Sequence, residues 1–244
     1  MLEKIKNILL GVSLSFAIFA ALFTIGMFPP ALAEAIAGYP GRIAGRILIQ
    51  IPVSFYLYKL VKKSGTRIRQ EPLRLGLPKT AGIILIFAAL CCVPIQYLYR
   101  MRPYDSTPPD YISVLLIAPI AEELGFRGAI FGKARKHLGF LPATIISSTL
   151  FQMAHGHIVH AFLTVPVAVC CCAAYEATGS LLLPIALHVT YNLVSALMDG
   201  VITMPVIMPI IAVAFYFIAM LIVIPMAFRI GVKAASETKR RVEA

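Results

Sequence analysis

Long apolar runs, separated by short polar connections, dominate the hydrophobic pattern of the chain. Most runs come close to the roughly 20 residues that a helix needs to cross a bilayer. Their apolar residues follow one another without amphipathic spacing, which is typical of membrane spans. We therefore predict an all-α, polytopic integral membrane protein with about eight transmembrane helices, at 8–28, 46–61, 81–99, 111–131, 141–157, 158–175, 181–198 and 201–228.

The first apolar run allows two interpretations. Pro29 and Pro30 follow it and predict a helix break there, with a loop from Gly38 to Gly45 before the second run. The small residues Ala31–Ala33 also resemble a signal-peptide cleavage site. We favour a retained first helix, because the apolar run is longer than a typical signal-peptide core.

Basic residues gather at the ends of the apolar runs and predict the orientation of the chain. The net charge of +11 could indicate nucleic-acid binding, but this clustering follows the positive-inside rule instead, so we exclude a nucleic-acid partner. The basic segments are 4–6, 62–79, 133–136 and 229–241. Eight spans place all of them on one side, which predicts a multi-pass protein of the cell membrane with both termini cytoplasmic and membrane lipids around it.

Composition favours one membrane domain with three parts. Hydrophobic residues make up 59% of the 244 residues and charged residues 14%, with a mean hydropathy of +0.86. A soluble domain is nearer half apolar and a quarter charged. We divide the chain into N-terminal helices with a basic loop (1–110), a core that carries polar residues inside its apolar runs (111–198), and a last helix with a basic tail (199–244).

Three charged residues interrupt the fourth apolar run. Glu122, Glu123 and Arg127 lie in Pro119–Gly128, where even mild estimates put a mid-bilayer charge at about 2.5–3.5 kcal/mol. Glu123 and Arg127 are one helical turn apart and can pair. Glu122 is turned away by about 100°, so Arg127 cannot serve both carboxylates equally. We predict that Glu122 remains unpaired and is the candidate catalytic carboxylate.

Further polar residues lie in the later runs. His155 is in the fifth, and His188 and Asn192 share a face of the seventh. Two neighbouring polar side chains in hydrocarbon need a partner. We interpret His157 and His160 as structural hydrogen-bonding residues.

Other polar and reactive residues receive structural interpretations. Glu176 is read as a solvated or capping residue in the turn between the sixth and seventh runs. The five cysteines, Cys91, Cys92 and Cys170–Cys172, fall in apolar runs and form neither a disulfide framework nor a metal motif.

Together these groups suit hydrolysis of an amide. A carboxylate and an imidazole can hold and deprotonate water. A second imidazole and an amide can donate hydrogen bonds to an oxyanion. A zinc site made by His155, His188 and a glutamate stays open as the alternative. We favour the reading without a cofactor, because Asn192 is a poor zinc ligand.

Three motifs in this order resemble one known family. They are Glu122-Glu123-x-x-x-Arg127, Phe151-x-x-x-His155 and His188-x-x-x-Asn192. They resemble the CPBP family of CAAX proteases and bacteriocin-processing enzymes, also called Abi, which is related to the type II CAAX prenyl endopeptidase. The resemblance covers about 118–197. One departure is Gly125, where many members carry a bulky apolar residue, and we expect it to widen the cavity locally.

The resemblance implies an eight-helix glutamic-type intramembrane protease with an active-site cavity inside the membrane and with 111–198 as its catalytic core. Glu122 would be the base that acts with His155 on water, and His188 and Asn192 would form the oxyanion hole. Glu123 and Arg127 would order the site. The implied substrate is a peptide or a membrane-associated or lipidated protein. The alternatives are a non-enzymatic scaffold or bacteriocin-immunity factor that binds in the same cavity and, ranked last, a transporter.

Overall fold

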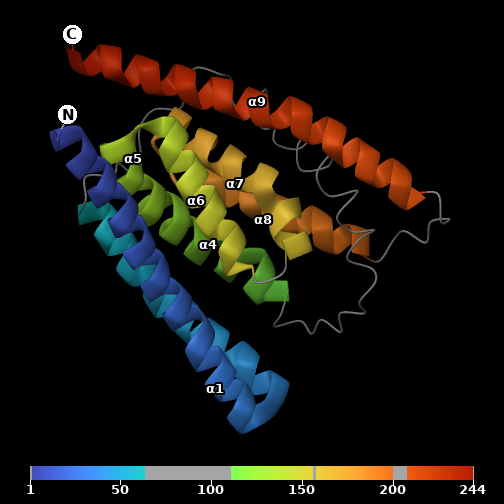
Figure 1. Cartoon of the computed structure of the whole chain (residues 1–244). Coiled ribbons are helices and arrows are strands. Elements are labelled where there is room, and N and C mark those ends of the chain that lie inside the picture. The colour runs from blue at the N-terminus through green and yellow to red at the C-terminus, as the bar shows by residue number, and fades with distance from the viewer. Residues whose placement is uncertain (1, 64–110, 156–157, 200–207, 244) are drawn as a thin grey trace.

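The computed structural model describes residues 2–63, 111–155, 158–199 and 208–243, and its regular elements are all helical (Figure 1). The described residues thus confirm the all-α class. Their elements are α1 (Leu2–Lys63), η1 (Ser113–Ile117), α4 (Ala118–Glu123), η2 (Leu124–Phe131), α5 (Gly132–Leu138), α6 (Phe140–Ala154), α7 (Ile158–Thr178), α8 (Leu182–Asp199) and α9 (Met208–Glu243).

The elements from η1 to α5 form one uninterrupted helix, 111–138, in which η1 and η2 are π-helical. The described chain thus contains six helical stretches. The predicted third span, 81–99, lies outside the described residues, as does most of the basic loop 62–79.

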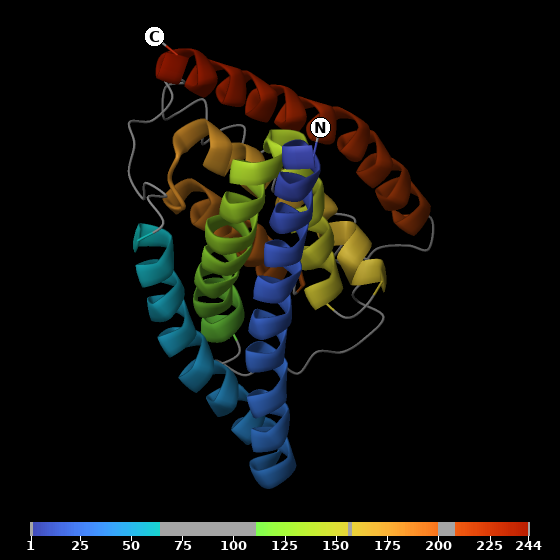
Figure 2. The ribbon, with the colours of Figure 1, turned by 60° about the vertical axis from the view of Figure 1, so that its left-hand side comes forward.

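α1 folds back on itself at the start of the loop that the sequence predicted at 38–45. The helix runs through Pro29 and Pro30, so the predicted break there is wrong. The chain reverses instead at Ala37 and Gly38, and Figure 2 shows the two limbs of the hairpin. Gly38 has φ 65° and ψ −158°, a combination that only glycine adopts readily. Each proline removes one helical hydrogen bond without ending the helix.

The two limbs of α1 approach closely just beyond the reversal. A methyl group added at Gly41 would collide with the Ala33 carbonyl, and one at Gly45 would lie 3.2 Å from Pro30 Cα. Small residues four apart allow helix backbones to pack this closely in membrane proteins. The expected loop 38–45 is therefore mostly helix, and its glycines form the contact between the limbs.

The expected membrane spans can be compared with the length and apolar composition of the described helices. Among the described residues, one helix, Glu3–Lys62, is long and apolar enough to cross a membrane. Shorter apolar helices occupy 140–154, 164–178 and 182–194. The count of eight spans is therefore not reproduced by the described part of the chain, which leaves out residues 64–110.

The α5–α6 turn is the meeting point of three distant segments. Gly11 of α1 faces His137 and Leu138, and Gly231 of α9 faces the ring of Phe140. The start of α1 and the end of α9 consequently lie at the same end of the molecule (Figures 1 and 2). Three of the basic segments named above therefore gather at one end.

A two-pronged ion pair closes the same end of the bundle. Arg135 Nε and Nη2 donate to the two carboxylate oxygens of Glu176 at 2.9 and 2.8 Å. The Glu176 side chain is only 9% exposed. The interpretation of Glu176 as a solvated or capping residue is therefore wrong, because a guanidinium matches both carboxylate oxygens at once. The pair joins α5 to α7.

Aromatic edge-to-face contacts build the core beside this end. The Phe131 ring packs against Phe140 and Tyr175 with centroids 6.1 and 5.9 Å apart, and Phe140 also packs against Phe228 of α9. Such pairs each contribute about 0.5–1.5 kcal/mol beyond their buried area. They fix α6, α7 and α9 around the helix that carries the charged motif.

We predict that Gly231→Ala destabilises the protein by about 1–3 kcal/mol, the usual cost of overpacking. The new methyl group would fall inside the Phe140 ring, so α9 would have to move. The matched control is Gly26→Ala, where no atom lies within 4 Å and stability should stay equal or rise. Thermal unfolding in detergent measures both. Equal melting temperatures for the two variants would contradict this packing.

Candidate active site

The helix 111–138 carries the carboxylates at a change in its winding. α4 ends at Glu123, and the following segment, η2, is π-helical. Pro119 lies inside the continuous helix 111–138, next to the change from η1 to α4, and its missing N–H removes one helical hydrogen bond there. π-helical turns are rare and occur frequently at functional sites. Glu122 and Glu123 thus lie at the junction of two helix types.

Glu123 and Arg127 form the predicted ion pair. Arg127 Nη1 donates to Glu123 Oε1 at 2.8 Å, and both side chains are 0% exposed. Arg127 Nη2 also donates to the Ala168 carbonyl of α7 at 3.0 Å. The guanidinium lies 4.6 Å from the centroid of the Phe151 ring. A buried guanidinium needs several such partners to offset its lost hydration, and three helices supply them here.

His188 connects the two adjacent carboxylates. Its Nδ1 is 2.9 Å from Glu123 Oε1, and its Nε2 is 3.8 Å from Glu122 Oε2. The imidazole is nearly buried, and Glu122 is 30% exposed, against 0% for Glu123. Glu122 is therefore the accessible carboxylate and Glu123 the enclosed one. The two glutamates thus differ in exposure and in partners, with His188 as a neighbour of both, and the chemical role of Glu122 stays a prediction.

His155 follows the last residue of α6 and is oriented by its own helix. Its Nδ1 lies 2.7 Å from the Phe151 carbonyl oxygen. A carbonyl only accepts hydrogen bonds, so Nδ1 carries the hydrogen and Nε2 is the basic nitrogen of the neutral ring. The hydrogen bond thus selects one tautomer of His155.

Phe151 links the two histidines. Its ring centroid is 4.5 Å from that of His155 and 5.7 Å from that of His188. The ring is fully buried and also faces Arg127. The sequence showed Phe151 only as a motif position. Its role as the shared wall of the site follows from the fold, since aromatic residues in apolar runs are too common to stand out.

Asn192 lies one turn after His188 on α8. Its Nδ2 donates to the Val114 carbonyl of η1 at 2.8 Å. An amide nitrogen carries two hydrogens, so this bond uses one of them. The bond ties α8 to the π-helical segment that precedes the glutamates. A side-chain donor to a backbone carbonyl leaves no trace in the sequence, and this partner could not be predicted.

Gly125 does not face the site. A methyl group at Gly125 would meet Leu22 Cδ1 at 3.0 Å and Leu57 Cδ1 at 3.8 Å, both on α1. The expectation that Gly125 widens the active-site cavity is therefore wrong. The missing side chain allows the α1 hairpin to pack against η2.

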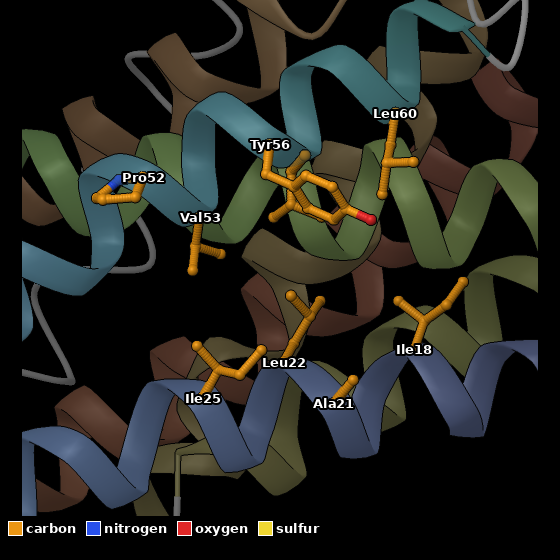
Figure 3. Close-up of a pocket in the computed structure, with 9 residues that line it drawn as sticks. Ile18, Ala21, Leu22, Ile25, Pro52, Val53, Tyr56 and Leu60 are labelled. Atoms are coloured by element: carbon orange, nitrogen blue, oxygen red, sulfur yellow. The ribbon is translucent and has the colours of Figure 1, made fainter.

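An apolar cleft of about 390 Å³ lies between the two limbs of α1 (Figure 3). Leu22 and Leu57, which cover Gly125, belong to its lining, and Tyr56 lies across it. The charged motif residues do not line this cleft. The intramembrane cavity expected around Glu122 stays a prediction.

The described part of the chain contains no preformed cluster of metal ligands. No group of three or more His, Cys, Asp or Glu residues is placed there to hold an ion. In the zinc alternative the ligands would be His155 and His188, whose Nδ1 atoms lie within hydrogen-bond distance of the Phe151 carbonyl and Glu123. His157 lies outside the described residues, and the side chain of His160 is not described.

Comparison with known protein families gives a match for the middle of the chain. A family model described as "Type II CAAX prenyl endopeptidase Rce1-like" matches residues 105–194, the segment with all three motifs. The chain matches no curated protein and no solved structure. The predicted family resemblance is confirmed over this segment. Residues 105–194 thus form a domain of the Rce1-like type II CAAX prenyl endopeptidase family, a family of membrane proteases.

Proposed function

We propose that this protein is an intramembrane endopeptidase in which Glu122 and His155 activate water. Its substrate is a peptide or a membrane-associated or lipidated protein, cleaved as a CAAX protease cleaves. One observation carries the proposal. Of the two adjacent glutamates, only Glu123 is enclosed by Arg127 and His188, while Glu122 keeps an accessible carboxylate beside an imidazole.

The proposed reaction needs one water and no covalent intermediate. The water donates one hydrogen to Glu122 and the other to Nε2 of His155. Glu122 takes its proton, and the hydroxide adds to the scissile carbonyl carbon. The protonated Glu122 then gives the proton to the leaving nitrogen as the C–N bond breaks. Both groups return to their first state.

In this proposal, side chains of α8 donate hydrogen bonds to the oxyanion. Asn192 offers the second hydrogen of Nδ2, because the first is bound to Val114. His188 Nδ1–H donates to Glu123, so His188 Nε2 can donate only when the ring carries both protons. Donation by His188 would therefore come from the imidazolium form.

The proposed membrane arrangement is eight spans with both termini cytoplasmic. The gathering of basic segments from α1, α5 and α9 at one end of the molecule supports it. The parts 1–110, 111–198 and 199–244 remain our proposed division of one membrane domain.

We predict that Glu122→Gln lowers cleavage at least about 100-fold while the protein stays folded, because an amide cannot take the proton. The measurement uses purified protein and a fluorogenic peptide with a prenylated CAAX end, beside the same peptide without the lipid. The control is Glu34→Gln, which removes an exposed ion pair with Arg42.

Wild-type turnover by Glu122→Gln would overturn the mechanism. If neither peptide is cleaved, membrane peptides are compared between cells that carry the wild type and cells that carry Glu122→Gln. A peptide that depends on Glu122 identifies the substrate without prior choice of a sequence. A cell phenotype that survives both Glu122→Gln and His188→Ala would favour the scaffold or immunity alternative, because binding would then suffice.

We predict that Arg127→Met destabilises the protein by about 3–5 kcal/mol, because it leaves the Glu123 charge buried without its partner. The double variant Glu123→Gln/Arg127→Met should regain part of that stability and still fail to cleave. Thermal unfolding in detergent and the peptide assay measure the two effects separately. A double variant no more stable than Arg127→Met would show that the ion pair is not the cause.

We predict that exhaustive chelation leaves the rate of cleavage unchanged. The proposed steps use only side chains of the protein, and Asn192 is not a metal ligand of choice. Activity after treatment with a zinc chelator, compared with activity after added zinc, measures this. Loss of activity that zinc restores would support the zinc alternative.

A further inference from the structure

Ser147 is a buried serine on the apolar helix α6, and its hydrogen bond leaves its own helix. A serine or threonine inside a helix often donates to the carbonyl four residues earlier, as Thr144 does to Phe140 at 2.9 Å. Ser147 Oγ donates instead to the Phe126 carbonyl of η2, also at 2.9 Å. Ser147 and Thr144 are both 0% exposed. The bond of Ser147 therefore joins α6 to the helix that carries the glutamates.

The acceptor of this bond, Phe126, lies beside the buried ion pair. It directly precedes Arg127 within η2, and a carbonyl oxygen has two lone pairs, so it can accept from a side chain as well as from the backbone. The Phe126 ring also packs edge-to-face on Phe151 of α6, with centroids 5.1 Å apart. A ring contact tolerates small shifts, whereas a hydrogen bond weakens steeply away from its preferred angle. The Ser147 bond consequently sets the register of η2 on α6.

This register bears on the two groups that activate water in the proposed function. His155 follows α6, eight residues after Ser147, and Glu122 lies on α4, four residues before Phe126. At about 1.5 Å per residue, the bond is roughly 12 Å from one group and 6 Å from the other along their helices. The two groups belong to different helices, and the bond crosslinks those helices. Its loss would let Glu122 and His155 shift against each other.

Ser148, the next residue on α6, offers a matched comparison. Its side chain is also buried, at 7% exposure, but its hydroxyl has no hydrogen-bond partner among the described residues. The two serines have the same atoms and lie on the same helix, and they differ in the bond to η2. Removing each hydroxyl in turn therefore separates the effect of this bond from the effect of losing a buried hydroxyl.

We propose that Ser147 is a positioning residue that fixes the distance between Glu122 and His155 through its hydrogen bond to the Phe126 carbonyl. This inference rests on the proposed function. Ser147 touches no substrate and transfers no proton in it, and it acts only by holding η2 against α6. A carbonyl only accepts hydrogen bonds, so position 147 needs a donor and alanine cannot replace serine there.

The test compares Ser147→Ala with Ser148→Ala in the full-length protein in detergent, with the prenylated fluorogenic peptide, at a temperature where both variants are folded. Ser147→Ala should lower kcat about three- to tenfold, as expected for the loss of one buried hydrogen bond. KM should stay within about twofold, because no group that touches the substrate is removed. Ser148→Ala should leave both kcat and KM unchanged.

A second readout does not depend on cleavage. Phenylalanine labelled with ¹³C at its carbonyl and arginine labelled with ¹⁵N give a coupled NMR signal where arginine directly follows phenylalanine, at 126–127 and 228–229. The substitution Arg229→Lys, at an exposed residue, identifies the second signal by its loss. The Phe126 carbonyl resonance should move upfield in Ser147→Ala and not in Ser148→Ala. The Phe228 resonance should stay in place as the internal reference.

The two readouts separate the positioning role from the proposed function. If the wild type cleaves no peptide, the proposed function fails, and the Phe126 resonance still decides whether Ser147 holds η2. An unmoved Phe126 resonance, equal kcat for the two alanine variants, or a loss confined to KM would overturn the proposal.

Discussion

The buried ion pair of Glu123 and Arg127 is the constraint on which the site depends. Two charges with no exposed surface lose several kcal/mol of hydration each, and only close, well-oriented partners offset that loss. The partners come from separate helices: the Ala168 carbonyl from α7, the Phe151 ring from α6 and His188 from α8. Satisfying this pair therefore assembles the helices that carry the other site residues.

The same constraint separates two chemically identical neighbours. Glu123 Oε1 is fully used by Arg127 and His188, so it holds groups in place. Glu122 points to another face, keeps 30% of its side chain exposed and meets His188 only at 3.8 Å. Two carboxylates with the same chemistry can take different roles when one is enclosed and the other is accessible. That asymmetry is the physical basis for assigning the proposed base.

Contacts that depend on helical periodicity and charge could be predicted from the sequence. Hydrogen bonds to backbone atoms could not. The pairing of Glu123 with Arg127 follows from a spacing of four residues, and the structure confirms it. The acceptors of Arg127 and Asn192 are main-chain carbonyls of Ala168 and Val114, which any residue would supply. The reversal of α1 at Gly38 lies at the start of the predicted loop, whereas the break predicted at Pro29 and Pro30 was wrong, because the helix continues through both prolines.

The two π-helical segments explain how the glutamates are held along the helix axis. Val114 in η1 accepts from Asn192 of α8, and Phe126 in η2 accepts from Ser147 of α6. A carbonyl oxygen has two lone pairs, so it can take a side-chain donor in addition to its helical bond. Side chains of two different helices thus anchor the backbone on either side of α4. Glu122 sits between these anchors, so its position is set by the neighbouring helices as well as by its own.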